Sequence, residues 1–173
     1  MNAALKYTLA FALAAGAGHL ATIMAAPRAI MHVALGKLSN DGAAINRFVF
    51  GDRVTRQSRN VVRPSPDLAY ASCVYDLSGG PLLVTAAPSP EGGYVSISVF
   101  DARTDNIAVF DSSQHPQGIR FVLAREGQAV PDGERIVRAQ YDDGVILDRR
   151  LAPTAEMFAA ADQARRMDSC APL

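Results

Sequence analysis

A run without a charged residue near the amino terminus constrains this chain more than any other feature. The run extends from Tyr7 to Ala26, and a helix of about 20 residues rises about 30 Å, which matches the hydrocarbon core of a bilayer. It therefore predicts one transmembrane helix at the start of the chain. Pro27 follows where that helix would leave the bilayer, so we expect a kink or a break there. The apolar segment 29–38 predicts a helical continuation at the membrane surface.

A cleavable signal peptide is the alternative interpretation of the same run. Lys6 would be its basic region, Tyr7–Ala14 its apolar region and Ala15-Gly16-Ala17 its cleavage site. The mature protein would then be secreted. Apolar residues continue past that site to Leu20 and beyond, which favours an uncleaved anchor.

Short strands and turns follow a proline-rich segment at 61–67, which should be a stiff extended lead-in. Between positions 69 and 77 the side chains alternate, and one apolar face holds Ala71, Cys73, Tyr75 and Leu77. The turn Gly79-Gly80-Pro81 and the apolar segment 82–86 come next, and together they predict a β-hairpin.

The rest of the chain continues this pattern. Further strands are predicted at 94–100, 107–110, 119–123, 135–140 and 145–148. Asp142-Asp143-Gly144 predicts a second hairpin, between the last two of these strands. A final helix, opened by Pro153 and Thr154 and reaching about Met167, should cover one face or edge of a sheet.

The fold class is therefore mainly β: an antiparallel β-sandwich or a partly open barrel, with an N-terminal transmembrane helix and a C-terminal packing helix. We divide the chain into an anchor with a juxtamembrane helix (1–38), a connector (39–66) and a β domain with the C-terminal helix (67–173). Within the connector, segment 43–50 should form a short helical or irregular piece. We expect it to dock on the β domain through Ile45, Phe48, Val49 and Phe50.

Several motifs in the chain resemble those of one known family. They are Arg63-Pro64-Ser65-Pro66-Asp67, Cys73-Val74-Tyr75-Asp76-Leu77-Ser78-Gly79-Gly80-Pro81, Gly93-Tyr94-Val95-Ser96-Ile97 and Leu151-Ala152-Pro153-Thr154. With the apolar amino terminus and the late Cys170, they resemble the domain of unknown function 1254 family in its short membrane-anchored bacterial form. The resemblance implies a companion membrane protein that carries a domain of unknown function 1214. It supplies no catalytic residues.

The two cysteines, Cys73 and Cys170, have no third or fourth metal ligand near them in the sequence. In an exported domain such a pair predicts a disulfide rather than a metal site, and two unpaired buried thiols are the alternative. The balance of basic residues around the apolar run weakly favours a cytoplasmic domain. The cysteines and the family resemblance favour the opposite, so we expect a single-pass protein of the inner (cytoplasmic) membrane with its C-terminal domain in the periplasm.

The sequence carries no sign of several common classes of function, although this does not exclude an enzyme. The formal net charge is zero and no block of basic residues occurs, so nucleic acid is not an expected partner. The chain has no phosphate-binding loop, dinucleotide fingerprint, HExxH motif or nucleophile elbow. We expect no cofactor, no metal and no catalytic residues.

Two sets of residues are candidates for a site. The first is a ridge of small residues at helical spacing with a histidine beside it, which would suit a second transmembrane helix: Ala14, Gly18, His19 and Thr22. The second could converge at one end of the sandwich and bind a small polar ligand: Arg63, Asp67, Tyr70, Tyr75, Asp101 and Arg103. The alternatives are an alanine-rich anchor with an incidental histidine, and aspartates that cap turns.

From these features we expect a membrane-anchored periplasmic β domain of unknown biochemical activity. It would act as an accessory or interaction subunit of the companion membrane protein rather than as an enzyme. The alternative is a domain that binds a small polar ligand of unknown identity, or an uncharacterised enzyme, using the Arg63/Asp67/Tyr70 region.

Overall fold

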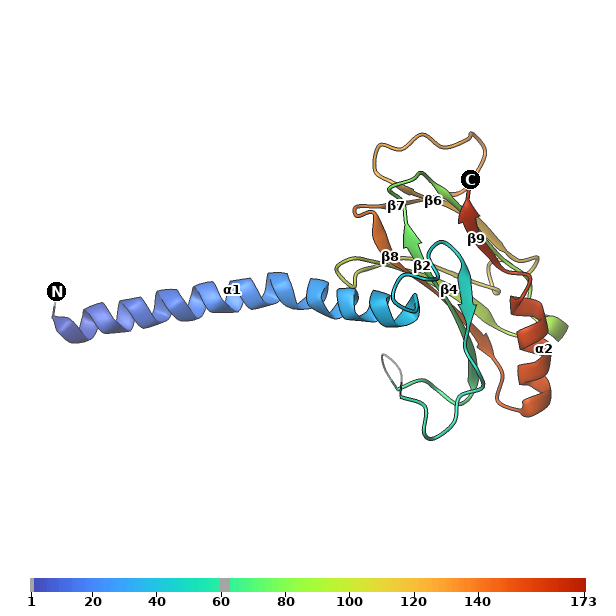
Figure 1. The fold of residues 1–173 in the computed structure, drawn as a ribbon, viewed down its shortest axis with the longest axis horizontal. Coiled ribbons are helices and arrows are strands. Elements are labelled where there is room, and N and C mark those ends of the chain that lie inside the picture. Colours follow the sequence, from blue (N-terminus) through green and yellow to red (C-terminus); the bar gives the residue numbers. More distant parts are fainter. Residues whose placement is uncertain (1, 60–62) are drawn as a thin grey trace.

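A computed structural model of the protein describes residues 2–59 and 63–173. A helix projects from a domain of two β-sheets, and a second, shorter helix packs on the far side of that domain (Figure 1). The fold is mainly β, as the sequence predicts. Neither sheet closes on itself, so the domain is an open sandwich and not a barrel.

The first sheet has five antiparallel strands in the order β1-β2-β8-β4-β5. Their bounds are β1 Phe48–Phe50, β2 Leu68–Asp76, β8 Asp143–Leu151, β4 Val95–Asp101 and β5 Asn106–Asp111. The strand β1 lies inside the segment 39–66 that the sequence assigned to a connector. Segment 43–50 is therefore partly a strand, and its Phe48 is buried in the core as expected.

The second sheet has four strands in the order β7-β6-β3-β9. Their bounds are β7 Ile136–Ala139, β6 Ile119–Arg125, β3 Leu82–Ala86 and β9 Ser169–Pro172. Strands β6 and β7 are parallel, and the other pairs are antiparallel. A short 3₁₀ helix, η1 Pro90–Gly92, precedes β4.

Both predicted hairpins are wrong, for the same reason. Strand β2 pairs with β1 and β8, whereas β3 pairs with β6 and β9 in the other sheet. Likewise β7 pairs with β6, and β8 pairs with β2 and β4. Each turn therefore carries the chain from one sheet to the other. The two crossings lie side by side, because the amide of Leu77 donates to the carbonyl of Asp142 at 2.8 Å.

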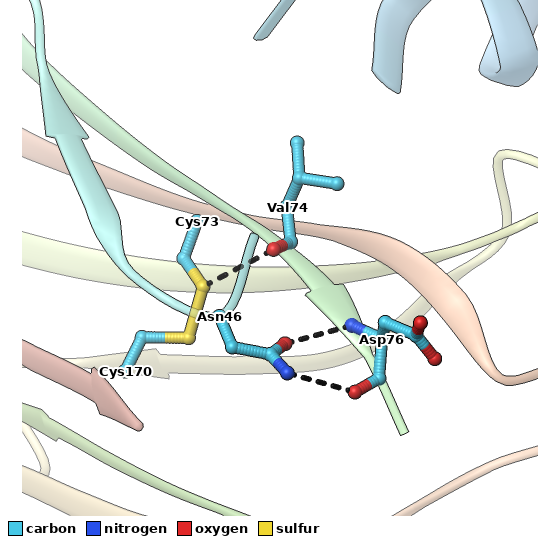
Figure 2. Close-up of a disulfide and its surroundings, with 5 residues drawn as sticks. All are labelled: Asn46, Cys73, Val74, Asp76 and Cys170. Atoms are coloured by element: carbon cyan, nitrogen blue, oxygen red, sulfur yellow. Dashed lines mark hydrogen bonds between the residues drawn. A yellow bond between two sulfur atoms is a disulfide. The ribbon is translucent and has the colours of Figure 1, made fainter. Parts of the chain in front are cut away.

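The predicted inward face of β2 is confirmed. Ala71, Cys73, Tyr75 and Leu77 are all buried in the core between the sheets. Cys73 forms a disulfide with Cys170 of β9, so the predicted bridge joins the two sheets through their interior (Figure 2). Beside the bridge, the side chain of Asn46 bonds both the amide and the carbonyl of Asp76, at 2.8 and 2.9 Å. Asn46 thus pairs with β2 as a strand residue would.

The C-terminal helix α2, Ala155–Arg165, begins at the predicted cap. The hydroxyl of Thr154 accepts from the amide of Met157 at 3.2 Å, which satisfies one free donor of the first turn. Ala161 packs with two alanines at the end of the first sheet. The guanidinium of Arg165 is buried, donates to the carbonyls of Tyr70 and Gly51, and lies over two phenylalanine rings.

The N-terminal helix α1 extends from Ala3 to Leu38 and continues through Pro27, where the sequence predicted a kink or a break. It is long and apolar enough to cross a membrane, although a signal sequence would pass the same test. Its last turns pack on the domain, where Met31 and Ala34 are buried against Val145 of β8, and Arg28 contacts Tyr141. The remainder projects away from the domain (Figure 1).

Candidate functional site

The structure divides the six predicted ligand residues between opposite ends of the first sheet. On β2, Tyr70 lies opposite Arg149, whereas Tyr75 lies opposite Gly144. Asp101 of β4 also lies opposite Gly144. Because each strand residue advances about 3.3 Å, the two tyrosines are about 17 Å apart along the strand. One pocket cannot use both groups.

The end that contains Arg63, Asp67 and Tyr70 is occupied by structural contacts. The amide of Ser65 donates to the hydroxyl of Tyr70 at 2.9 Å and fixes the proline-rich lead-in against the sheet. The backbone carbonyl of Asp67 accepts from the amide of Ala152 at 2.8 Å. Both Arg63 and Asp67 are exposed, and these contacts account for the conformation of the segment without a ligand.

The end that contains Tyr75, Asp101 and Arg103 is held by buried hydrogen bonds. The hydroxyl of Tyr75 donates to the carbonyl of Phe100 at 3.1 Å. Burial, and then the nearby carboxylates of Asp101 and Asp143, raise the pKa of Tyr75 well above its usual range, so it stays a neutral donor. The carboxylate of Asp101 accepts from the amides of Arg103 and Asp105, at 2.8 and 3.1 Å, and caps the β4–β5 turn.

A hollow of about 410 Å³ opens beside the end of the sheet that contains Tyr75, between α1, the last residues of β2 and the first residue of β8. Its polar lining comes from distant parts of the chain and includes His32, Asp41, Asp76 and Asp143. Carboxylates and an imidazole would suit a cationic ligand. Among the described residues, no three such side chains come close enough together to hold a metal ion. Sequence reasoning missed this hollow, because the segments that form it are far apart in the chain.

An ionic cluster that the sequence did not predict lies between the sheets. Arg150 donates to Asp148 at 3.2 Å and to both carboxylate oxygens of Asp168 at 2.9 Å, and the Asp148 and Arg150 side chains are fully buried. Burial outweighs the arginine and raises the pKa of Asp148 to about 7. The pKa of Asp168 is also raised, again by burial. Through Arg150, the cluster fastens the segment before β9 to β8. Asp168 also accepts from the amide of Ala87 at 2.8 Å, which ties the same segment to the end of β3.

The predicted helix-partner face is open. Ala14, Gly18, His19 and Thr22 are exposed on the part of α1 that projects from the domain. The hydroxyl of Thr22 donates to the carbonyl of Gly18 at 2.9 Å, so its polarity is satisfied within the helix. A β-carbon added at Gly18 would meet nothing within 4 Å. This face therefore has room for the close approach of another helix.

Comparison with known proteins gives a family and a fold. The family described as "Protein of unknown function (DUF1254)" matches residues 45–172, which confirms the resemblance seen in the sequence. The crystal structure of the VPA0106 protein from Vibrio parahaemolyticus is 16% identical, with a TM-score of 0.67 over 85% of this chain and 35% of that one. At this identity the likeness shows the fold alone.

A putative uncharacterized protein from Burkholderia cenocepacia is 18% identical, with a TM-score of 0.47 over 73% of this chain and 36% of that one. This chain therefore spans about a third of the length of either solved structure. No curated protein matches it.

Proposed function

This chain belongs to the DUF1254 family, and on that premise we propose that it is a membrane-anchored periplasmic domain that serves as the accessory subunit of a companion membrane protein. The observation that carries the proposal is the form of α1. Its apolar side chains are exposed from Leu5 to Ile30, and the helix then packs on the β domain without an intervening loop. Such a helix needs lipid or protein around it.

Two further observations favour a partner. The small-residue face of α1 would let a second helix come close, and His19 could hydrogen-bond across that contact. In addition, the fold occupies only about a third of the VPA0106 chain. We expect the partner to be a separate subunit that carries a domain of unknown function 1214. The disulfide between the sheets fits an oxidising compartment such as the periplasm.

Purification of the full-length protein from native membranes in mild detergent, with mass spectrometry of the proteins retained, tests the proposal. We expect one stoichiometric membrane protein. Gly18→Ile should reduce its recovery, because a branched side chain would fill the small-residue face. Gly16→Ile is the matched control: it is two residues away on the opposite side of the helix, and it also meets nothing within 4 Å. Equal recovery with both variants would remove this face from the proposal, and recovery of the chain alone would refute the subunit role.

The hollow beside α1 supports a second candidate function, the binding of a small polar ligand. Three aspartates and a histidine line it, so a cationic amine is the favoured ligand class. This moves the ligand hypothesis away from the Arg63/Asp67/Tyr70 region. A thermal-shift screen of small amines would test it: a stabilising amine should lose its effect in Asp143→Asn and keep it in Asp67→Asn, where the substituted carboxylate is exposed.

A further inference from the structure

Tyr141 joins the β domain to α1 at the place where the apolar part of that helix ends. Its hydroxyl is 3.4 Å from a guanidinium nitrogen of Arg28, and the Arg28 guanidinium lies 5.7 Å from the centre of its ring. Arg28 is the first charged residue after Lys6. It is two residues past Ala26, which is about 3 Å along a helix axis. Headgroup layers are about 5–7 Å thick on each side of the hydrocarbon, so Tyr141 falls within that layer when α1 spans a bilayer.

Arg103 lies near the same tyrosine, in the β4–β5 turn. Tyr141 raises the pKa of Arg103, and the carboxylates of Asp105 and Asp101 raise it further by a smaller amount. The Nε of Arg103 is buried and has no partner among the residues that the structure describes. Within the same part of the chain, neither Arg28 nor Arg103 forms a salt bridge.

The acidic residues nearby are largely engaged. The Asp101 carboxylate caps the turn backbone, as described above. Asp142, next to Tyr141, pairs with Arg125 at 3.0 Å. Among the described residues, two guanidinium groups that form no salt bridge therefore lie near one hydroxyl, and Arg28 contacts it directly. This arrangement is typical of a site for an oxyanion such as a phosphate.

The outer side of α1 is consistent with the same depth. Ile30 and Val33 point away from the domain and are 61% and 58% exposed. Both residues follow Arg28 in the helix. In this part of α1, one side is apolar and exposed, and the opposite side packs on the β domain. Figure 1 shows that the free part of α1 leaves the domain on the side where the β7–β8 connection lies. That connection contains Tyr141.

We propose that Arg28, Arg103 and Tyr141 form a binding site for the phosphate group of a membrane phospholipid. The site rests on the proposed membrane anchoring of α1. Tyrosine suits this depth because its ring is apolar and its hydroxyl is polar, and arginine can bond a phosphate through two nitrogens at once. The bound lipid would hold the membrane-facing end of the sandwich against the bilayer surface.

The chain contains no tryptophan, which makes a direct test simple. Gln140→Trp gives a single tryptophan beside the proposed site in the full-length protein, at an exposed position, and leaves Tyr141 in place. Tyr94→Trp is the matched control: Tyr94 is 45% exposed and directly precedes β4, whereas Asp101 ends that strand. Tyr94 and Asp101 are therefore about 23 Å apart along the strand direction. Both variants are placed in phosphatidylcholine–phosphatidylglycerol vesicles that contain a lipid spin-labelled on its headgroup.

We expect the label to quench the emission of the Gln140→Trp variant strongly and that of the Tyr94→Trp variant little. Arg28→Gln and Arg103→Gln, added to Gln140→Trp, should each lower the docked population about fivefold, because one basic residue near an anionic surface contributes that much. Arg53→Gln serves as the arginine control, since Arg53 bonds the carbonyl of Pro153 at the other end of the sheet. Equal quenching in the two tryptophan variants, or no effect of the two arginine substitutions, would overturn the inference.

Carbonate extraction of the same vesicles separates the two proposals. Protein that stays with the lipid while the Gln140→Trp variant is not quenched refutes the phosphate site and leaves the anchor intact. Protein that is released refutes both. Inorganic phosphate added to the detergent-solubilised Gln140→Trp variant tests the other source of the ligand. A change in emission with free phosphate, without quenching in vesicles, would identify a soluble anion site and overturn the lipid assignment.

Discussion

Loss of the Cys73–Cys170 disulfide should remove a large part of the stability of the β domain. The bond closes a loop with a sequence separation of 97 residues. The chain-entropy model gives about 4.7 kcal/mol for a loop of this length, because the cross-link restricts the unfolded chain. For a protein of this size, a destabilisation of that order lowers the melting temperature by about 10–20 °C. We expect this shift for Cys73→Ala/Cys170→Ala relative to the oxidised wild type.

The location of the bond adds a local prediction. It ties β9, a strand of four residues at the end of the chain, to β2 in the opposite sheet. Without it, β9 keeps its hydrogen bonds to β3 but loses its covalent fastening. Amide exchange in β9 should then accelerate far more than in β8, which is paired on both sides.

Thermal unfolding of the full-length protein in detergent, with and without reductant, is the assay. The double variant is the control, because reductant should not change its melting temperature. Alkylation of the unreduced protein followed by mass spectrometry must leave both cysteines unlabelled. Labelled cysteines, or equal melting temperatures for the oxidised protein and the double variant, would refute the reasoning.

Three further predictions concern buried polar groups. The pKa of Asp148 is raised from 3.8 to about 7 in the fold, so its contribution to stability is complete below pH 3.8 and is lost as the pH rises to about 7. Urea unfolding at a series of pH values measures this, and Asp148→Asn should reduce the fall in the free energy of unfolding between pH 3.8 and 7. The same fall in the variant as in the wild type would contradict the prediction. Arg165→Met leaves the carbonyls that it bonds without a donor and should cost about 3 kcal/mol in urea unfolding, whereas a cost below about 1 kcal/mol would show that water replaces it. Asn46→Ala removes both side-chain bonds to β2 and should cost about 1–2 kcal/mol, with faster amide exchange at Asp76; unchanged exchange would argue against its strand-like pairing.

The sequence predicted the features of this fold that depend on neighbours along the chain. Alternation between positions 69 and 77 identified the buried face of β2, and Thr154 identified the start of α2. The disulfide also followed, because Cys73 lies on that buried face and only one other cysteine exists. The strand face and the helix start depend on residues close together in the sequence, and two cysteines allow only one disulfide.

Strand pairing was not predictable in the same way. Gly79-Gly80-Pro81 has the residues of a hairpin turn. A crossing between two sheets needs the same backbone freedom, since Gly80 has a φ of 132°. Turn chemistry therefore shows that the chain reverses and does not show which strand it will pair with. That choice depends on partners more than 60 positions away, such as Leu147 opposite Ser72.

The candidate sites show the same limit. The six residues proposed as one ligand cluster all lie near strand ends. Every strand has two ends, however, and the sequence does not show which ends lie together. The ionic cluster was hidden because Asp148 and Arg150 alternate with Leu147 and Arg149, which suggests a solvent-facing polar stretch. Their inward side is set by the register with β2, where Asp148 lies opposite Ala71.

The continuity of α1 has a mechanical consequence. No flexible loop separates its exposed apolar part from the turns that pack on Val145. The helix and the sandwich therefore move as one lever, and a tilt or rotation of the helix is transmitted to the whole domain. Helices in bilayers tilt by about 20° on average. A partner that changes this tilt would reorient the far end of the sandwich without any change in the fold, so α1 could transmit a signal as well as hold the domain in place.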